Sequence, residues 1–209
     1  MIERHKVFIS YYHFDDQSYK NKLIEMNHFN FEKLKYESIF EDYSVRNGDI
    51  DDTFMTSEQI RRKIRDEYIK DATVLILLCG KNTKKRKHVD WEIHAAMYDS
   101  EVNPQMGIIV INLPEINQGI RVSEDSEKNL IGPNTNWRLL STRDEYESLY
   151  PYMPSRIIDN FVKNVPITVA DWNRISSDPN ILMQLIDNAF KRRKCISYDH
   201  STPLRKNNS

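Results

Sequence analysis

The chain has 209 residues, and its 30 Lys and Arg balance 31 Asp and Glu to a formal net charge of -1. This balance excludes a global field that would draw the protein to nucleic acid or to an anionic membrane. Its 2 cysteines exclude a disulfide framework and a thiolate metal site. The longest apolar run, residues 72–79, is far shorter than the roughly 20 residues of a membrane helix. No signal-peptide core opens the sequence. We therefore expect a cytoplasmic protein with no nucleic-acid partner, no membrane partner and no metal.

Apolar runs alternate with helical periodicities through the first half of the chain. The runs are short and rich in β-branched residues, which is typical of strands buried on both faces. The order β-α-β-α-β-α-β predicts an α/β fold with a mainly parallel central sheet and helices on both faces. The predicted elements are a strand at 7–11, a helix from about 13 to 26, a strand at 36–40, a helix at 56–70, a strand at 72–79, a helix with the buried stripe Val89, Ile93, Ala96 and Met97, and a strand at 106–113.

The second half is less regular. Residues from about 114 to 160 are predicted to form an irregular insertion, because Pro, Gly, Asn and Ser interrupt every apolar run. Residues 165–169 predict an edge strand, where Pro166 is tolerated. Asp178 and Pro179 predict the N-cap and first residue of a last helix. The prediction is one domain over 1–190 and a basic, disordered tail over 191–209.

Glu92, in the segment Lys-His-Val-Asp-Trp-Glu-Ile, is the first candidate for a functional residue. It lies on the helix that follows the strand at 72–79, and open α/β sheets bind ligands at the carboxyl ends of their strands. Ser10 and Tyr11 end the first strand and belong to the same edge. The alternative interpretation is that Glu92 is one more solvated residue on an amphipathic helix.

The first strand, the acidic loop after the second strand and the helix that carries Glu92 together resemble the TIR domain. The stretch from Lys81, Asn82 and Thr83 to Glu92 is similar in particular to the TIR-like proteins of the bacterial Thoeris antiphage system. The resemblance covers about residues 6–113. It implies a flavodoxin-like three-layer sandwich. It also implies cleavage of NAD, with release of nicotinamide and formation of an ADP-ribose derivative, often cyclic, that activates a partner effector.

The resemblance also implies roles for individual residues. Glu92 matches the catalytic glutamate, Phe8 and Ser10 fall in the first-strand motif, and residues 42–52, with Asp42 and Asp49, correspond to the loop that borders the nucleotide. Many TIR enzymes carry Trp four residues before the glutamate. This chain has His88 there and Trp91 directly before Glu92, so the nicotinamide side of the pocket differs from the family pattern.

Several of these side chains have a purely structural interpretation as well. Phe8 fits the core, with its carbonyl or ring edge free to meet a ligand, and Tyr11 fits either a stacked base or a buried hydroxyl. Asn82 is expected to contact ribose or phosphate, or to close a turn. His88 is four residues from Glu92, so the two form a hydrogen-bonded pair, a pocket wall or a surface ion pair.

The sequence therefore predicts an NAD-cleaving enzyme with Glu92 as its catalytic residue. NAD is the substrate, and no cofactor is expected. The chemistry fits a solitary carboxylate, because the nicotinamide leaving group is already cationic and no acid has to protonate it. We also expect self-association on activation and a downstream effector reached through the nucleotide product. The alternatives are a non-catalytic TIR-like assembly module and, with less support, a nucleoside-directed transferase.

Overall fold

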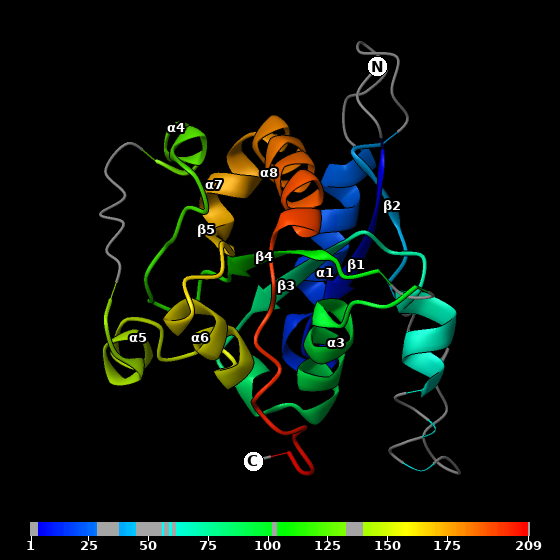
Figure 1. The fold of residues 1–209 in the computed structure, drawn as a ribbon. Coiled ribbons are helices and arrows are strands. Elements are labelled where there is room, and N and C mark those ends of the chain that lie inside the picture. Colours follow the sequence, from blue (N-terminus) through cyan, green and yellow to red (C-terminus); the bar gives the residue numbers. More distant parts are fainter. Residues whose placement is uncertain are drawn as a thin grey trace.

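The computed structural model is a three-layer α/β sandwich around a five-stranded parallel sheet (Figure 1). It describes residues 4–28, 38–44, 56, 59, 62–101, 104–132 and 140–208. The strand order is β2-β1-β3-β4-β5, a doubly wound order in which the chain direction across the sheet reverses between β1 and β3. The strands are β1 (His5–Ser10), β2 (Phe40–Asp42), β3 (Val74–Cys79), β4 (Gly107–Asn112) and β5 (Thr168–Asp171).

Helices cover both faces of the sheet, as the alternating pattern predicts. They are α1 (His13–His28), the π-helix η2 (Ile64–Ile69), η3 (Thr83–Lys85), α3 (Lys87–Met97), η4 (Asp125–Glu127), α4 (Lys128–Ile131), α5 (Arg143–Leu149), α6 (Ser155–Val162), α7 (Trp172–Ser177), α8 (Pro179–Arg192) and η5 (Arg193–Cys195). A capping box is present at Thr56 and Gln59, where the helix over 56–70 is predicted to begin, since each backbone N–H donates to the other's side-chain oxygen. Asp178 caps α8 by accepting from Asn180 N at 2.9 Å, as predicted.

Two hydrophobic cores lie on opposite faces of the sheet. Alternate residues of β3 supply them, Leu75 and Leu77 to the face covered by α3 and α6, and Ile76 and Leu78 to the face covered by α1 and α8. Helix α8 approaches the sheet closely at Gly107. A Cβ there would lie 2.2 Å from the Ala189 carbonyl oxygen of α8. Glycine therefore lets α8 contact β4 directly.

The C-terminal segment, residues 196–208, is not disordered, so this part of the predicted tail is corrected. Figure 1 shows it running between α6 and α3, drawn in red. The Tyr198 hydroxyl donates to Met106 O at 2.8 Å, and the Arg156 guanidinium donates to Thr202 O at 2.9 Å. Trp91 Nε1 donates to Arg205 O at 2.9 Å. Most of these bonds end on backbone atoms of the segment, so they require no periodic apolar pattern.

The predicted irregular insertion contains two regular helices, and that prediction is corrected. Thr142 and Glu145 form a capping box at the start of α5, and α6 buries Ile157, Ile158 and Phe161 against the α3 side of the sheet. Both helices are shorter than the window over which a helical period becomes visible.

Strand boundaries shift by a few residues. Strand β5 is an edge strand, as predicted, but begins at Thr168 rather than at residue 165. Strand β2 begins at Phe40, and residues 36 and 37 of the predicted second strand lie outside the described residues. In the part of the chain that the structure describes, no helix combines the length and apolarity needed to cross a bilayer.

Candidate active site

A buried carboxyl group and a serine hydroxyl meet at the carboxyl end of the sheet. Ser10 is the last residue of β1, and its Oγ donates to Glu92 Oε2 on α3 at 2.6 Å. Glu92 is 7% exposed and Ser10 is 1% exposed. The helix presents Glu92 to β1 because its apolar stripe, all four predicted residues of which are buried, packs on the sheet. Glu92 is therefore not a solvated residue of an amphipathic helix.

Burial raises the pKa of Glu92 from 4.5 to about 8, although the hydrogen bond from Ser10 lowers it. A carboxyl group in this state is largely protonated at neutral pH. A cation placed beside it would favour the ionised form and lower the pKa again. The site can therefore gain a negative charge when a positively charged group binds.

Tyr11 directly follows Ser10, and Asp42 ends the neighbouring strand β2. Burial raises the pKa of Tyr11 to about 12, with smaller contributions from the charges of Glu92 and Asp42, while the bond from its hydroxyl to Gln17 Oε1 at 2.7 Å lowers it. Asp42 ends β2, forms an ion pair with Lys20 at 3.1 Å and accepts a hydrogen bond from the backbone N–H two residues later. Both side chains thus have structural partners at this edge.

The other predicted site residues have different environments. Phe8 is 1% exposed and belongs to the core on the α3 side. The Asn82 amide donates to Asp15 Oδ2 at 2.8 Å, which links the loop after β3 to the first turn of α1. The half-buried His88 ring lies 5.1 Å from the Trp91 ring, centroid to centroid. Asp49 lies outside the described residues.

A second buried carboxyl was not among the predicted site residues. Asp16, in the first turn of α1, is 2% exposed, and burial raises its pKa to about 6. Thr83 Oγ1 donates to it at 3.3 Å, and a Cβ on Gly80 would lie 2.6 Å from its Oδ1. Acidic residues are typical of the first turn of a helix, so residue type alone does not mark Asp16 as a buried carboxyl.

A cation and a ring form a second contact between the loop after β1 and the start of α3. The Arg86 guanidinium carbon lies 3.7 Å from the centroid of the Tyr12 ring. Arg86 Nε is buried, and no hydrogen-bond acceptor reaches it in the described part of the chain. In the sequence Arg86 is one member of the basic run at 84–87, Lys-Lys-Arg-Lys. Only the tertiary structure distinguishes it from its neighbours in that run.

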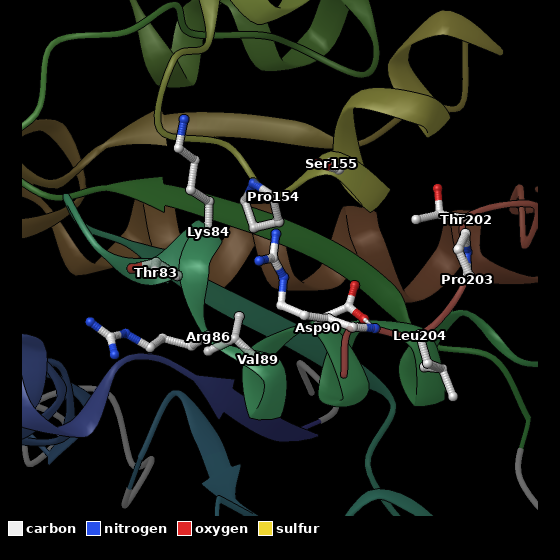
Figure 2. A pocket seen from close by; sticks show the side chains of 11 residues that line it. Thr83, Lys84, Arg86, Val89, Asp90, Pro154, Ser155, Thr202, Pro203 and Leu204 are labelled. Atoms are coloured by element: carbon white, nitrogen blue, oxygen red, sulfur yellow. Dashed lines mark hydrogen bonds between the residues drawn. The ribbon is translucent and has the colours of Figure 1, made fainter. Parts of the chain in front are cut away.

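A cavity of 210 Å³ lies beside Arg86, which is one of its lining residues (Figure 2). Its walls come from the start of α3, the start of α6 and the C-terminal segment. The lining residues are Thr83, Lys84, Arg86, Val89, Asp90, Pro154, Ser155, Thr202, Pro203, Leu204 and Arg205. Glu92 does not line this cavity. Within the described residues, no cluster of three or more His, Cys, Asp or Glu side chains could hold a metal ion.

The fold and this site define a doubly wound α/β protein with a buried carboxylate at the carboxyl edge of its sheet. Residues 8–118 match the family model described as "Thoeris protein ThsB, TIR-like domain", which is more than half of the 209 residues. The chain therefore belongs to this family of TIR-like proteins, and the resemblance seen in the sequence is confirmed. The comparison with curated proteins found no match.

One solved structure similar to the chain is described as "Structure of the activated Roq1 resistosome directly recognizing the pathogen effector XopQ (TIR domains)". It is 12% identical, with a TM-score of 0.40, and the match covers 88% of this chain and 98% of that chain.

Proposed function

We propose that this protein cleaves the bond between nicotinamide and ribose in NAD, with Glu92 as the catalytic carboxylate. The observation that carries the proposal is the Ser10–Glu92 pair, a buried carboxyl held at 2.6 Å by a hydroxyl at the end of β1. Ser10 lies opposite Leu77 of β3, so the pair is next to the β1–β3 reversal where sheets of this order bind nucleotides. Membership in the TIR-like family supports the same substrate.

The chemistry of the bond fits a single carboxylate. As the C–N bond breaks, its electron pair goes to the nicotinamide ring, which leaves neutral, and positive charge develops on the ribose. An ionised Glu92 would stabilise that charge in a site that excludes water. The positive nicotinamide ring of the bound substrate would itself favour the ionised form, because an opposite charge lowers the pKa of a carboxyl group.

We further propose, from the family resemblance, that the ribosyl cation is captured within the same nucleotide, which gives a cyclic ADP-ribose species. This product would act as a signal to a partner effector in antiphage defence. Self-association on activation belongs to the same proposal.

The test is nicotinamide release from NAD by the purified full chain, followed by chromatography. We expect Glu92→Gln to lower the rate by about 100-fold or more, the usual effect of removing a group that stabilises transition-state charge. Glu101→Gln, at an exposed position, is the matched control and should leave the rate unchanged. Undiminished release by Glu92→Gln would refute the role of Glu92.

The assay should be repeated at rising protein concentration and with a crowding agent, since activation is proposed to involve assembly. Absence of release under all these conditions would favour the alternative, a TIR-like assembly module without activity. The proposal of NAD cleavage would then be rejected.

A further inference from the structure

Two contacts join the end of β1 to α3, and the proposed catalysis uses only the first of them. The first is the bond from Ser10 Oγ to Glu92 Oε2. The second, two residues further along the chain from β1, is the stack of the Arg86 guanidinium on the Tyr12 ring at 3.7 Å. Two residues of extended chain span at most about 7 Å, and six residues of helix rise about 9 Å. The two contacts are therefore neighbours along the carboxyl edge.

The stack on Tyr12 leaves the Nε–H of Arg86 without an acceptor among the described residues. A guanidinium is planar and binds an aromatic ring through its face, while its five N–H groups point outward in its own plane. Arg86 Nε is buried without an acceptor among the described residues, as are the Nε atoms of Arg121 and Arg192. Those two guanidinium groups, however, donate through Nη1 to Val165 O and to Glu127 Oε1. Nearly all buried donors in proteins have a partner, and an exception calls for an explanation such as a ligand. A planar fork with free N–H groups is the group that binds phosphate through two hydrogen bonds.

The neighbouring lysines of the basic run are used elsewhere. Lys84 Nζ donates to Pro151 O, Lys85 Nζ donates to Asn82 Oδ1, and Lys87 Nζ lies 5.5 Å from the centroid of the Trp91 ring. In Figure 2 the Arg86 side chain points away from Asp90 and Pro154 of the 210 Å³ cavity. The stack on Tyr12 shows that it points toward the loop after β1.

We propose that Arg86, oriented by Tyr12, binds the diphosphate of a dinucleotide whose ribose lies against Glu92. The diphosphate is bonded to C5′ of the ribose that loses its base at C1′, so the two groups need binding partners a short distance apart along one edge. Ser10–Glu92 and Tyr12–Arg86 supply such a pair. Arg86 is a binding and specificity-determining residue in this scheme, not a catalytic one. The inference rests on the proposed function for the identity of the dinucleotide.

The direct test is calorimetric titration of the full chain with ADP-ribose, and with adenosine as a ligand that lacks phosphate. We expect Arg86→Gln to weaken ADP-ribose binding about 10- to 100-fold, the range for losing hydrogen bonds to a charged group. Adenosine binding should not change. Arg86→Lys keeps the charge without the fork and should recover only part of the affinity. Lys85→Gln is the matched control, and its ADP-ribose affinity should equal that of the parent.

Equal ADP-ribose affinity in Arg86→Gln and the parent would overturn the proposal. So would equal losses in Arg86→Gln and Lys85→Gln, since a general effect of charge would explain them. Failure of the parent to bind ADP-ribose would overturn it too. Circular dichroism of each variant checks that the fold is intact.

The inference and the proposed function fail in different ways. Affinity for ADP-ribose that depends on Arg86, without nicotinamide release from NAD, would support the diphosphate site and reject the catalytic proposal. The reverse result would support the catalytic proposal and reject the diphosphate site. In that case the protein releases nicotinamide from NAD, but Arg86→Gln does not change the ratio of kcat/KM for NAD to kcat/KM for nicotinamide riboside, which has no phosphate.

Discussion

Replacing Glu92 by Gln tests whether the carboxyl is as buried as the structure shows. Burial raises its pKa from 4.5 to about 8. Between these two values the unfolded chain releases the proton while the folded chain keeps it. The folded state then binds more protons than the unfolded state, so the free energy of unfolding falls as pH rises through this window. Gln keeps the shape of the side chain and an acceptor for Ser10 Oγ, but does not titrate.

The size of the effect follows from linkage. Each pH unit in the window costs the parent about 1.4 kcal/mol, so the stability gained by Glu92→Gln over the parent should grow by about 4 kcal/mol between pH 5 and pH 8.5. Asp16, whose pKa is also raised, titrates in both proteins, and its contribution cancels in the difference.

The assay is urea unfolding, followed by circular dichroism, at several pH values from 5 to 8.5. Glu101→Gln, exposed in the structure, is the control and should follow the parent at every pH. Parallel curves for the parent and Glu92→Gln would refute the reasoning, because they would mean that the carboxyl has the same pKa in both states. Such a result would also remove the electrostatic argument for a site that responds to a bound cation.

Three further changes test the contacts around the site. Arg156→Met should lower the free energy of unfolding in urea by about 3–5 kcal/mol, because it removes two hydrogen bonds, at 3.0 and 3.2 Å, from Asp90, which is 9% exposed. Adding Asp90→Asn should recover part of the loss, and a loss under about 1 kcal/mol would contradict this reasoning. Gly80→Ala should cost about 1–3 kcal/mol, since the new Cβ would lie 2.6 Å from Asp16 Oδ1, and thermal unfolding should show less damage in an Asp16→Ala background. Trp91→Phe removes one donor to the C-terminal segment, and should cost about 0.5–1.5 kcal/mol and speed hydrogen exchange in residues 196–208; unchanged exchange would argue against an anchored segment.

The sequence predicted those features that depend on local chemistry. Continuous apolar runs identified β1, β3 and β4 to within a few residues, because strands buried on both faces need such runs. The predicted strands at 36–40 and 165–169 overlap β2 only at Phe40 and β5 only at residues 168–169. Helical periodicity identified the helix that bears Glu92. Cap residues such as Asp178 also indicated helix starts correctly. Alternation of strands and helices implied the parallel sheet. The sequence did not predict the short helices α5 and α6 in the second half, because both are too short to show a helical period.

The candidate site was only partly accessible to the same reasoning. Glu92 and Ser10 were predicted at the correct edge because the carboxyl ends of parallel strands meet there. Their contact joins residues 82 positions apart, and no local pattern encodes such a distance. The protonation of Glu92 follows from burial, which is a property of the packed structure.

The sequence by itself determined the α/β class, the family and the carboxylate that carries the proposed chemistry, because these depend on residue type and local period. Tertiary structure alone decided which of several adjacent cations stacks on Tyr12 in the loop after β1, and that the C-terminal segment is anchored between α3 and α6. Arg86 and Lys85 are equivalent as members of a charged run, and the Tyr12 ring distinguishes them only once β1 and α3 lie side by side. Contacts between segments distant in the chain fix the orientation of a side chain, and with it the electrostatics of the site.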